Sequence, residues 1–158
     1  MLLDFFPASA GRRAAAFSVG DQFPAELIFY PGSIAERAFI GRRDASLNIR
    51  DRLDWQQHIE TATDPLQTHA EQLLLQPWRL QSPVLLGAGH FAVDDSGNHW
   101  WQPTPGSQAE QSAIPIANKE IPTALYGVDL SACIVLWDGY QAQLLSCLSP
   151  WGLEAIDD

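Results

Sequence analysis

The side chains best suited to chemistry flank one short loop, with His90 and His99 on either side of Asp94 and Asp95. Imidazole and carboxylate groups ligate zinc and serve as general acids or bases in hydrolysis. A zinc site needs three or four such ligands, and the chain has no Cys-x-x-Cys, Cys-x-Cys or His-Glu-x-x-His motif. We therefore predict no metal site and no cofactor. A metal-dependent or other hydrolase assembled around His90, His99 and Asp94 is the alternative.

Two further chemistries also lack a complete motif. Serine hydrolases often present their nucleophile in Gly-x-Ser-x-Gly, which is absent, and Cys133 lies in a predicted core strand, where a thiol is inert. Gly87-Ala88-Gly89 leads into a β pattern, whereas a phosphate-binding glycine loop opens a helix. We predict no catalytic residue and favour a non-enzymatic role.

Aromatic side chains are the second source of function, because the chain has six tryptophans. Exposed aromatic residues often dominate binding energy at protein interfaces. Trp100 and Trp101 are adjacent in a predicted strand and therefore face opposite sides of its sheet. We predict an interaction surface that draws on Trp100, Trp101, Trp137 and Tyr140, with burial in the core as the competing interpretation.

Charge limits the partners of such a surface. The formal net charge of the chain is −10, and residues 80–158 carry Lys119 as their one basic group against nine acidic groups. An acidic surface repels phosphate backbones, whose affinity for proteins depends on lysine and arginine. A nucleic-acid-associated module is a further alternative, confined to the basic stretch of the first half. That stretch contains Arg37, Arg42, Arg43, Arg50 and Arg52.

Targeting signals are not found in the sequence. The apolar start, Met1 to Phe6, is too short and too acidic for a signal peptide. No segment reaches the roughly 18 apolar residues of a membrane span. Two cysteines do not make a disulfide framework. We predict a cytoplasmic protein.

Most of the elements that position these side chains are expected to be strands. Ala25–Tyr30 predicts a buried strand, and Phe39-Ile40 predicts its return strand. Val84–Leu86 predicts another strand. His90–Val93 and His99–Gln102 predict a hairpin across a loop of turn-forming residues.

Two central helices are expected over about residues 50–76. The first begins at Asn48 or Asp51 and runs to about Thr61. The second begins with a Thr-Asp cap before Pro65, since proline suits the first turn of a helix. Its apolar face consists of Leu66, Ala70, Leu73 and Leu74.

The strongest local signal is the hairpin around Asp138-Gly139, a favoured two-residue turn between apolar runs. Counting outward from this turn pairs Trp137 with Tyr140, Val135 with Ala142 and Cys133 with Leu144. In this register Cys147 falls on the other face from Cys133, so a disulfide between them would require a different pairing.

The sequence thus predicts one α+β domain over residues 1–158, with mostly antiparallel sheets from hairpins and the two central helices. A subdivision into 1–79 and an acidic, β-rich 80–158 is the alternative. Ala113–Ile116 is expected to be an edge strand because Pro115 cannot donate to a ladder. Residues 31–36 and 105–110 share a Pro-Gly-Ser pattern, which leaves an internal duplication open.

Several segments share their order with a known family. They are Leu2–Phe5, Ala25–Ser33, Arg37-Ala38, Gln76–Trp78, Ser82–Leu86, Trp100-Trp101 and Trp137–Gly139. In this order they resemble the C-terminal region of bacterial SWIM zinc-finger family proteins. The zinc motif of that family is Cys-x-Cys followed by Cys-x-His, and Cys133 and Cys147 match neither spacing. The resemblance therefore implies either the region downstream of the zinc motif or a relative that has lost the motif.

By association, the resemblance implies partners from MoxR-type ATPase and von Willebrand A-type systems. Together with the missing catalytic motifs, it favours a non-catalytic binding or accessory domain. We predict a protein-protein interaction role in a larger bacterial system.

Overall fold

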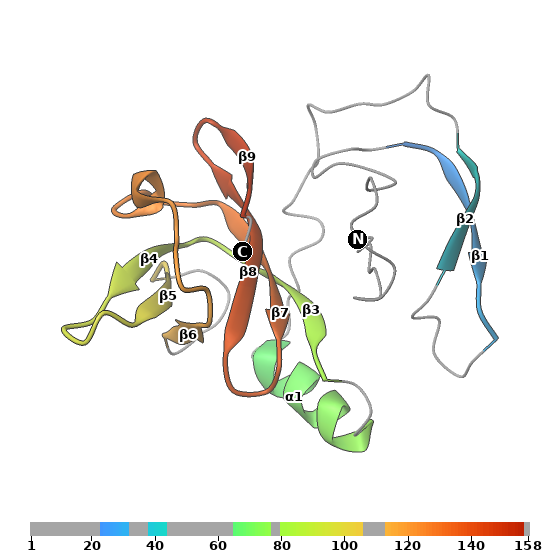
Figure 1. The fold of residues 1–158 in the computed structure, drawn as a ribbon, viewed down its shortest axis with the longest axis horizontal. Coiled ribbons are helices and arrows are strands. Elements are labelled where there is room, and N and C mark those ends of the chain that lie inside the picture. The colour runs from blue at the N-terminus through green and yellow to red at the C-terminus, as the bar shows by residue number, and fades with distance from the viewer. Residues whose placement is uncertain (1–22, 32–37, 44–64, 77–79, 106–112, 157–158) are drawn as a thin grey trace. The chain divides into compact units, whose positions relative to one another are not determined.

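The computed structural model describes residues 23–31, 38–43, 65–76, 80–105 and 113–156 (Figure 1). These residues are mostly β, with one α-helix and one 3₁₀ turn among them. The elements in chain order are β1 (Ala25–Phe29), β2 (Ala38–Arg43), α1 (Pro65–Leu75), β3 (Ser82–Leu86), β4 (Gly89–Val93), β5 (His99–Pro103), β6 (Ile114–Ile116), the 3₁₀ turn (Thr123–Leu125), β7 (Ala132–Trp137), β8 (Ala142–Ser149) and β9 (Gly152–Ala155).

Two compact units make up the chain, Met1–Leu53 and Asp54–Asp158. The expected α+β class with two central helices over about residues 50–76 is wrong. The second unit is built on a seven-stranded mixed sheet, and α1 is the one α-helix in the part that the structure describes. The first expected helix lies outside the described residues, as do most residues of 31–36 and 105–110, the two segments that share a Pro-Gly-Ser pattern.

β1 and β2 form the antiparallel hairpin that the sequence predicts, with Leu27 opposite Ile40. The expected burial of β1 is wrong, because Leu27 is only partly buried and four other large apolar side chains in or beside this hairpin are more than half exposed. No third strand pairs with these two among the described residues, and an isolated hairpin buries little surface. The exposed side chains are Ile28, Phe29, Tyr30 and Phe39.

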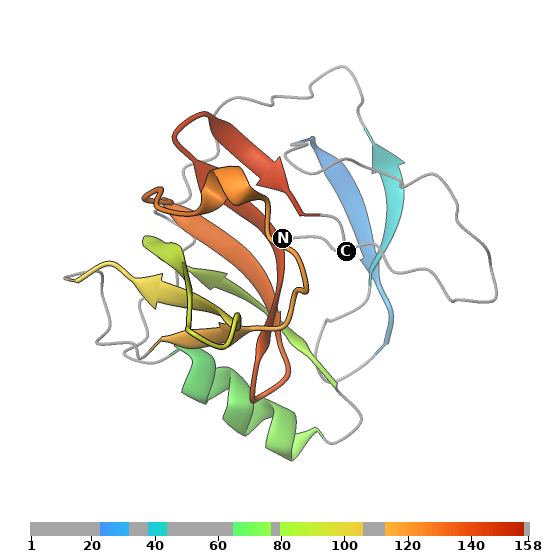
Figure 2. The same cartoon turned by 60° about the vertical axis from the view of Figure 1, so that its left-hand side comes forward.

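The sheet of the second unit closes on itself. Its strand order is β3-β7-β8-β6-β5-β4, with β9 added to β8. β3 and β4, the two end strands of this order, follow each other closely in the chain. Gly89 at the start of β4 pairs with Leu130, which lies just before β7. The Gly89 N–H donates to the Leu130 carbonyl at 3.0 Å, and the Leu130 N–H donates back at 2.8 Å. The strands therefore curve around a common interior, with α1 along one side (Figure 2).

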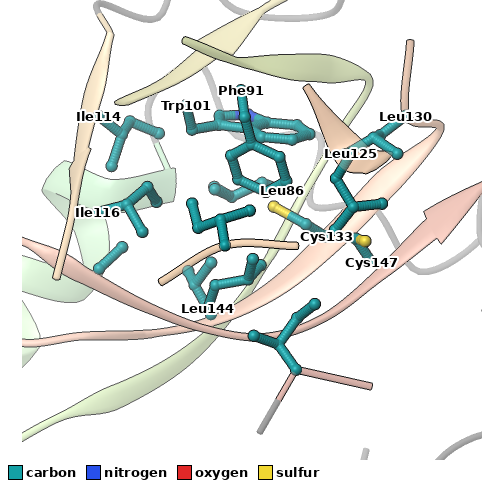
Figure 3. Packing of buried hydrophobic residues seen from close by; sticks show 14 of the residues in the cluster. Leu86, Phe91, Trp101, Ile114, Ile116, Leu125, Leu130, Cys133, Leu144 and Cys147 are labelled. Carbon is teal, nitrogen blue, oxygen red and sulfur yellow. The ribbon is translucent and has the colours of Figure 1, made fainter. Parts of the chain in front are cut away.

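The hydrophobic core fills this interior (Figure 3). Trp101 is fully buried, and the Phe91 ring meets it edge-on with centroids 5.1 Å apart. The other members of the core cluster are Val84, Leu86, Ile114, Ile116, Ile121, Leu125, Leu130, Cys133, Val135, Trp137, Ala142, Leu144, Cys147 and Ile156.

The α1 helix begins at Pro65, as the sequence predicts. Leu66 and Leu73 pack against the core, but Leu74 is 82% exposed and does not belong to the buried face. The Ser82 hydroxyl lies 2.9 Å from His69 Nδ1, which ties the helix to β3. None of the helices in the described residues has the length and apolar character needed to cross a membrane.

β6 is an interior strand between β5 and β8, which corrects its expected position at the sheet edge. N–H groups two residues apart point to the same side of a strand, and the Ala117 N–H donates to the Ala142 carbonyl at 2.8 Å. Pro115 lies two residues before Ala117, so the position of its missing N–H also faces the β8 side. The residues opposite Pro115 precede Ala142, where β8 begins. The ladder does not require a donor there, so proline is tolerated.

The β7–β8 hairpin forms as expected, but its register is wrong in the sequence-based prediction. The pairs next to the loop are Trp137–Ala142, Leu136–Gln143 and Val135–Leu144. The loop is therefore Asp138–Gln141 instead of Asp138-Gly139. The Asp138 carboxylate accepts the N–H groups of Tyr140 and Gln141 at 2.8 Å each, which stabilises the longer loop.

A bulge next to Val135 shifts the ladder again and places Cys133 directly opposite Cys147. The expectation of opposite faces is therefore wrong, and both free thiols lie in the core (Figure 3). Burial, followed by the proximity of Cys147, raises the pKa of Cys133 well above its ordinary value. Burial, followed by the charge of Glu154, raises the pKa of Cys147 to about 11. Both thiols are protonated at neutral pH and are structural rather than nucleophilic.

Candidate interaction surface

One row of side chains crosses the outer face of β4, β5 and β6. Residues alternate between the two faces of a strand, and Trp101 points into the core. The neighbouring residue Trp100 therefore points outward, and it pairs across the strands with Ala92 on one side and Pro115 on the other. We call these three partly exposed residues the Trp100 face.

The indole ring of Trp100 is the largest side chain of the Trp100 face, since the other two residues are an alanine and a proline. A residue of the β4–β5 loop fixes the orientation of the ring, because the Trp100 indole N–H donates to Asp94 Oδ2 at 3.1 Å. An aromatic ring that is already held in place loses little conformational entropy on binding. This arrangement is typical of an anchor residue at a protein interface.

Asp94 organises the loop that holds this ring. Its Oδ1 accepts the backbone N–H groups of Ser96 and Asn98 at 2.9 and 2.8 Å, and its Oδ2 accepts the Asn98 side-chain amide at 2.8 Å. These bonds, that of the Asn98 side chain first, lower the pKa of Asp94 from 3.8 to about 2. The carboxylate is ionised and its oxygens are engaged, so Asp94 positions Trp100 and is poorly suited to proton transfer.

The histidines of the hydrolase hypothesis are not brought together. His90 lies on the outer face, where its Nε2 is 3.0 Å from Gln102 Oε1. His99 lies on the inner side of the same hairpin, with its Nδ1 2.6 Å from the Tyr126 hydroxyl and its Nε2 3.3 Å from the Lys119 carbonyl. Among the residues that the structure describes, no three His, Cys, Asp or Glu side chains gather in a way that could hold a metal ion.

The four aromatic residues predicted to form a surface divide into two pairs. Trp101 and Trp137 are 0% and 8% exposed and belong to the core. Trp100 is partly exposed, and Tyr140 is 80% exposed at the tip of the β7–β8 loop. Sequence reasoning missed Trp151, which is 55% exposed in the turn before β9. The flanking Pro150 and Gly152 are turn residues and could have indicated this exposure.

Asn118 supports this part of the sheet from within, and sequence reasoning missed it. It is buried, its Oδ1 accepts the Leu144 N–H at 2.6 Å, and its Nδ2 donates to the Leu144 carbonyl at 3.1 Å. The side-chain amide thereby acts as one more peptide unit of β6 alongside β8. No local pattern reveals this role, because the partner is 26 residues further along the chain.

The described part of the second unit is strongly acidic. It contains seven Asp or Glu residues and a single basic one, Lys119, and Asp94 and Asp95 lie in the loop beside Trp100. Of the arginines in the nucleic-acid hypothesis, Arg42 and Arg43 are described, and both belong to the first unit. Arg43 stacks over the Phe23 ring at 4.0 Å. The other three arginines lie outside the described residues.

Comparisons with known proteins add no relative, since no protein-family model matches the chain and neither a curated protein nor a solved structure shows significant similarity to it.

Proposed function

We propose that this chain is a non-catalytic protein-binding module that takes its partner on the Trp100 face. The observation that carries the proposal is the fixed, outward-facing indole of Trp100, directly beside the core residue Trp101. A tryptophan ring that is not needed for the core, and that is held by a hydrogen bond from a loop, is well suited to recognition.

The separation of the candidate catalytic groups supports this choice over a hydrolase. His90 and His99 lie on opposite faces of the β4–β5 hairpin, and the carboxylate of Asp94 is engaged by its own loop. A general base must lie within hydrogen-bonding reach of the proton that it removes, together with its partner groups. These three residues do not share such a site.

The proposal includes a cytoplasmic location. Reducing conditions there would keep Cys133 and Cys147 as the free thiols of the structure. The resemblance to SWIM zinc-finger proteins adds a named expectation for the partner, a component of a MoxR-type ATPase or von Willebrand A-type system.

Affinity capture with an immobilised chain tests the proposal. The wild type, Trp100→Ala and Tyr140→Ala are exposed in parallel to lysate of the source organism, and retained proteins are identified by mass spectrometry. We expect a protein that is retained by the wild type and by Tyr140→Ala but lost with Trp100→Ala. Near-ultraviolet circular dichroism of each variant controls for folding.

Two outcomes would contradict the proposal. One is the absence of any protein that the wild type retains above a blank support. The other is retention that Trp100→Ala and Tyr140→Ala leave equally unchanged, which would place the binding surface elsewhere.

A further inference from the structure

We infer that the Trp100 face binds an extended basic segment of the partner, with an arginine or lysine side chain lying over the Trp100 ring. This inference rests on the proposed protein-binding function and adds the chemistry of the ligand. It is carried by the geometry of the face and by the charge of the unit that presents it.

The charge distribution of the Trp100 ring favours the binding of a cation. The Asp94 carboxylate accepts the indole N–H at 3.1 Å, which draws positive charge toward the edge of the ring and leaves its face more negative. Cations bind the faces of aromatic rings through this charge distribution, and tryptophan binds them best. The short side chains of Ala92 and Pro115 allow a ligand chain to reach the ring from either strand.

The surrounding charge favours the same ligand. Seven carboxylates against one lysine in the described part of this unit attract a basic segment and repel an acidic one. Asp95 is exposed in the loop next to Trp100. The carboxylate of Asp94 is already occupied, so Asp95 is the group available to pair with an incoming arginine.

The mode of binding follows from the strand order. β5 is paired with β4 on one side and with β6 on the other, and β4 is paired with β5 and bridged to residues 126 and 130. β5, which carries Trp100, is therefore paired on both sides, and a partner strand cannot add to it. The ligand must instead lie on the outer face and be recognised through side chains.

A peptide titration tests the inference. The ¹⁵N-labelled full chain is titrated at low ionic strength with a short, blocked peptide of alternating arginine and glycine. The control peptide has citrulline, an uncharged analogue of similar shape, in place of each arginine. The reporter is the indole N–H resonance of Trp100, identified by its absence from the spectrum of Trp100→Phe.

We expect the arginine peptide to shift the Trp100 resonance and the citrulline peptide to leave it in place. Trp100→Phe retains an aromatic ring but loses the indole, and should weaken binding by about fivefold. Asp95→Asn should weaken it by about twofold, since surface charge pairs contribute little. Tyr140→Ala and Trp151→Ala change exposed aromatic residues elsewhere and should bind like the wild type.

Three results would overturn the inference. Equal binding of both peptides would show that the positive charge is not recognised. Equal weakening by Trp100→Phe, Tyr140→Ala and Trp151→Ala would show only diffuse attraction to an acidic protein. If lysate capture depends on Trp100 while the arginine peptide leaves its resonance unshifted, the protein-binding proposal stands and this ligand chemistry is wrong.

Discussion

The inner and outer faces of β4, β5 and β6 come from alternating residues of the same strands, yet they are packed in opposite ways. On the inner face, Trp101 contacts the Phe91 ring and lies over Gly89, which has no side chain to displace it. On the outer face, Trp100 stands between two short side chains and is held by a hydrogen bond from the loop. One ring is held by packing, and the other by a polar contact at its edge.

This difference separates the free energy of folding from the free energy of binding. Core packing is lost when a side chain is truncated, because surrounding atoms fill the cavity only in part. A partly exposed ring leaves no such cavity. Adjacent positions in one strand can therefore be changed to affect mainly stability or mainly recognition.

The largest expected effect is that of Trp101→Ala, which should destabilise the fold by about 3–5 kcal/mol because it leaves a cavity in the core. Trp100→Ala should cost clearly less, because this ring is partly exposed and its removal leaves no closed cavity. Urea unfolding followed by circular dichroism measures both. Similar losses for the two variants would contradict the division between an inner stability face and an outer binding face.

Gly89→Ala should have the next largest effect, about 1–3 kcal/mol of destabilisation from overpacking. A Cβ atom at this position would lie 2.6 Å from the Gln102 carbonyl oxygen and 2.6 Å from the Trp101 ring. Urea unfolding of Gly89→Ala alone and together with Trp101→Leu tests the cause. Leucine at position 101 is smaller than tryptophan and should recover part of the stability lost in Gly89→Ala. If the losses of the two single variants simply add in the double variant, the contact with the Trp101 ring is not the cause.

The sequence predicted the outer face in part. The turn residues between His90–Val93 and His99–Gln102 correctly predicted the β4–β5 hairpin, and strand alternation correctly separated Trp100 from Trp101. Alternation alone does not tell which of the two points inward. That choice depends on Gly89 and Phe91 in the neighbouring strand, and so on tertiary packing.

The β7–β8 register shows why other parts could not be predicted. Lengthening the loop from two residues to four slides the pairing without moving Val135 or Leu144 to another face, so the hydrophobic pattern fits both registers. The Asp138 carboxylate favours the longer loop, and the later bulge brings Cys133 opposite Cys147. The closure of the sheet through Gly89 and Leu130 could not be predicted either, because it is a long-range contact without a local signal.

The stability of the fold should depend on acidic pH through Asp94, which holds Trp100 on the outer face, and not through the packing of the inner face. The pKa of Asp94 is about 2 in the folded chain against an ordinary 3.8, so its charged form stabilises the fold. That contribution is present above about pH 4 and is lost as the pH falls toward 2. In Asp94→Asn the amide oxygen still accepts a hydrogen bond, but the titrating group is gone.

Thermal unfolding between pH 2 and 5 therefore compares the wild type with Asp94→Asn, with Asp95→Asn as the control that removes the same charge from the same loop. We expect the melting temperature of Asp94→Asn to fall less steeply with acid than that of the other two. Parallel curves for all three chains would show that the Asp94 bonds in the loop do not stabilise the fold.

The smallest expected effect belongs to another core tryptophan, Trp137 of β7, and sharpens the contrast with Trp100. The buried indole N–H of Trp137 has no hydrogen-bond partner in the part of the chain that the structure describes. Burying an unpaired donor is unfavourable, so Trp137→Phe removes an unfavourable group along with some packing, and the two effects oppose each other. We expect a change within about 1 kcal/mol in urea unfolding, whereas Trp137→Ala loses about 3–5 kcal/mol. If Trp137→Phe were instead nearly as unstable as Trp137→Ala, the indole N–H would have an acceptor in solution, and this ring, like Trp100, would be held by a polar contact.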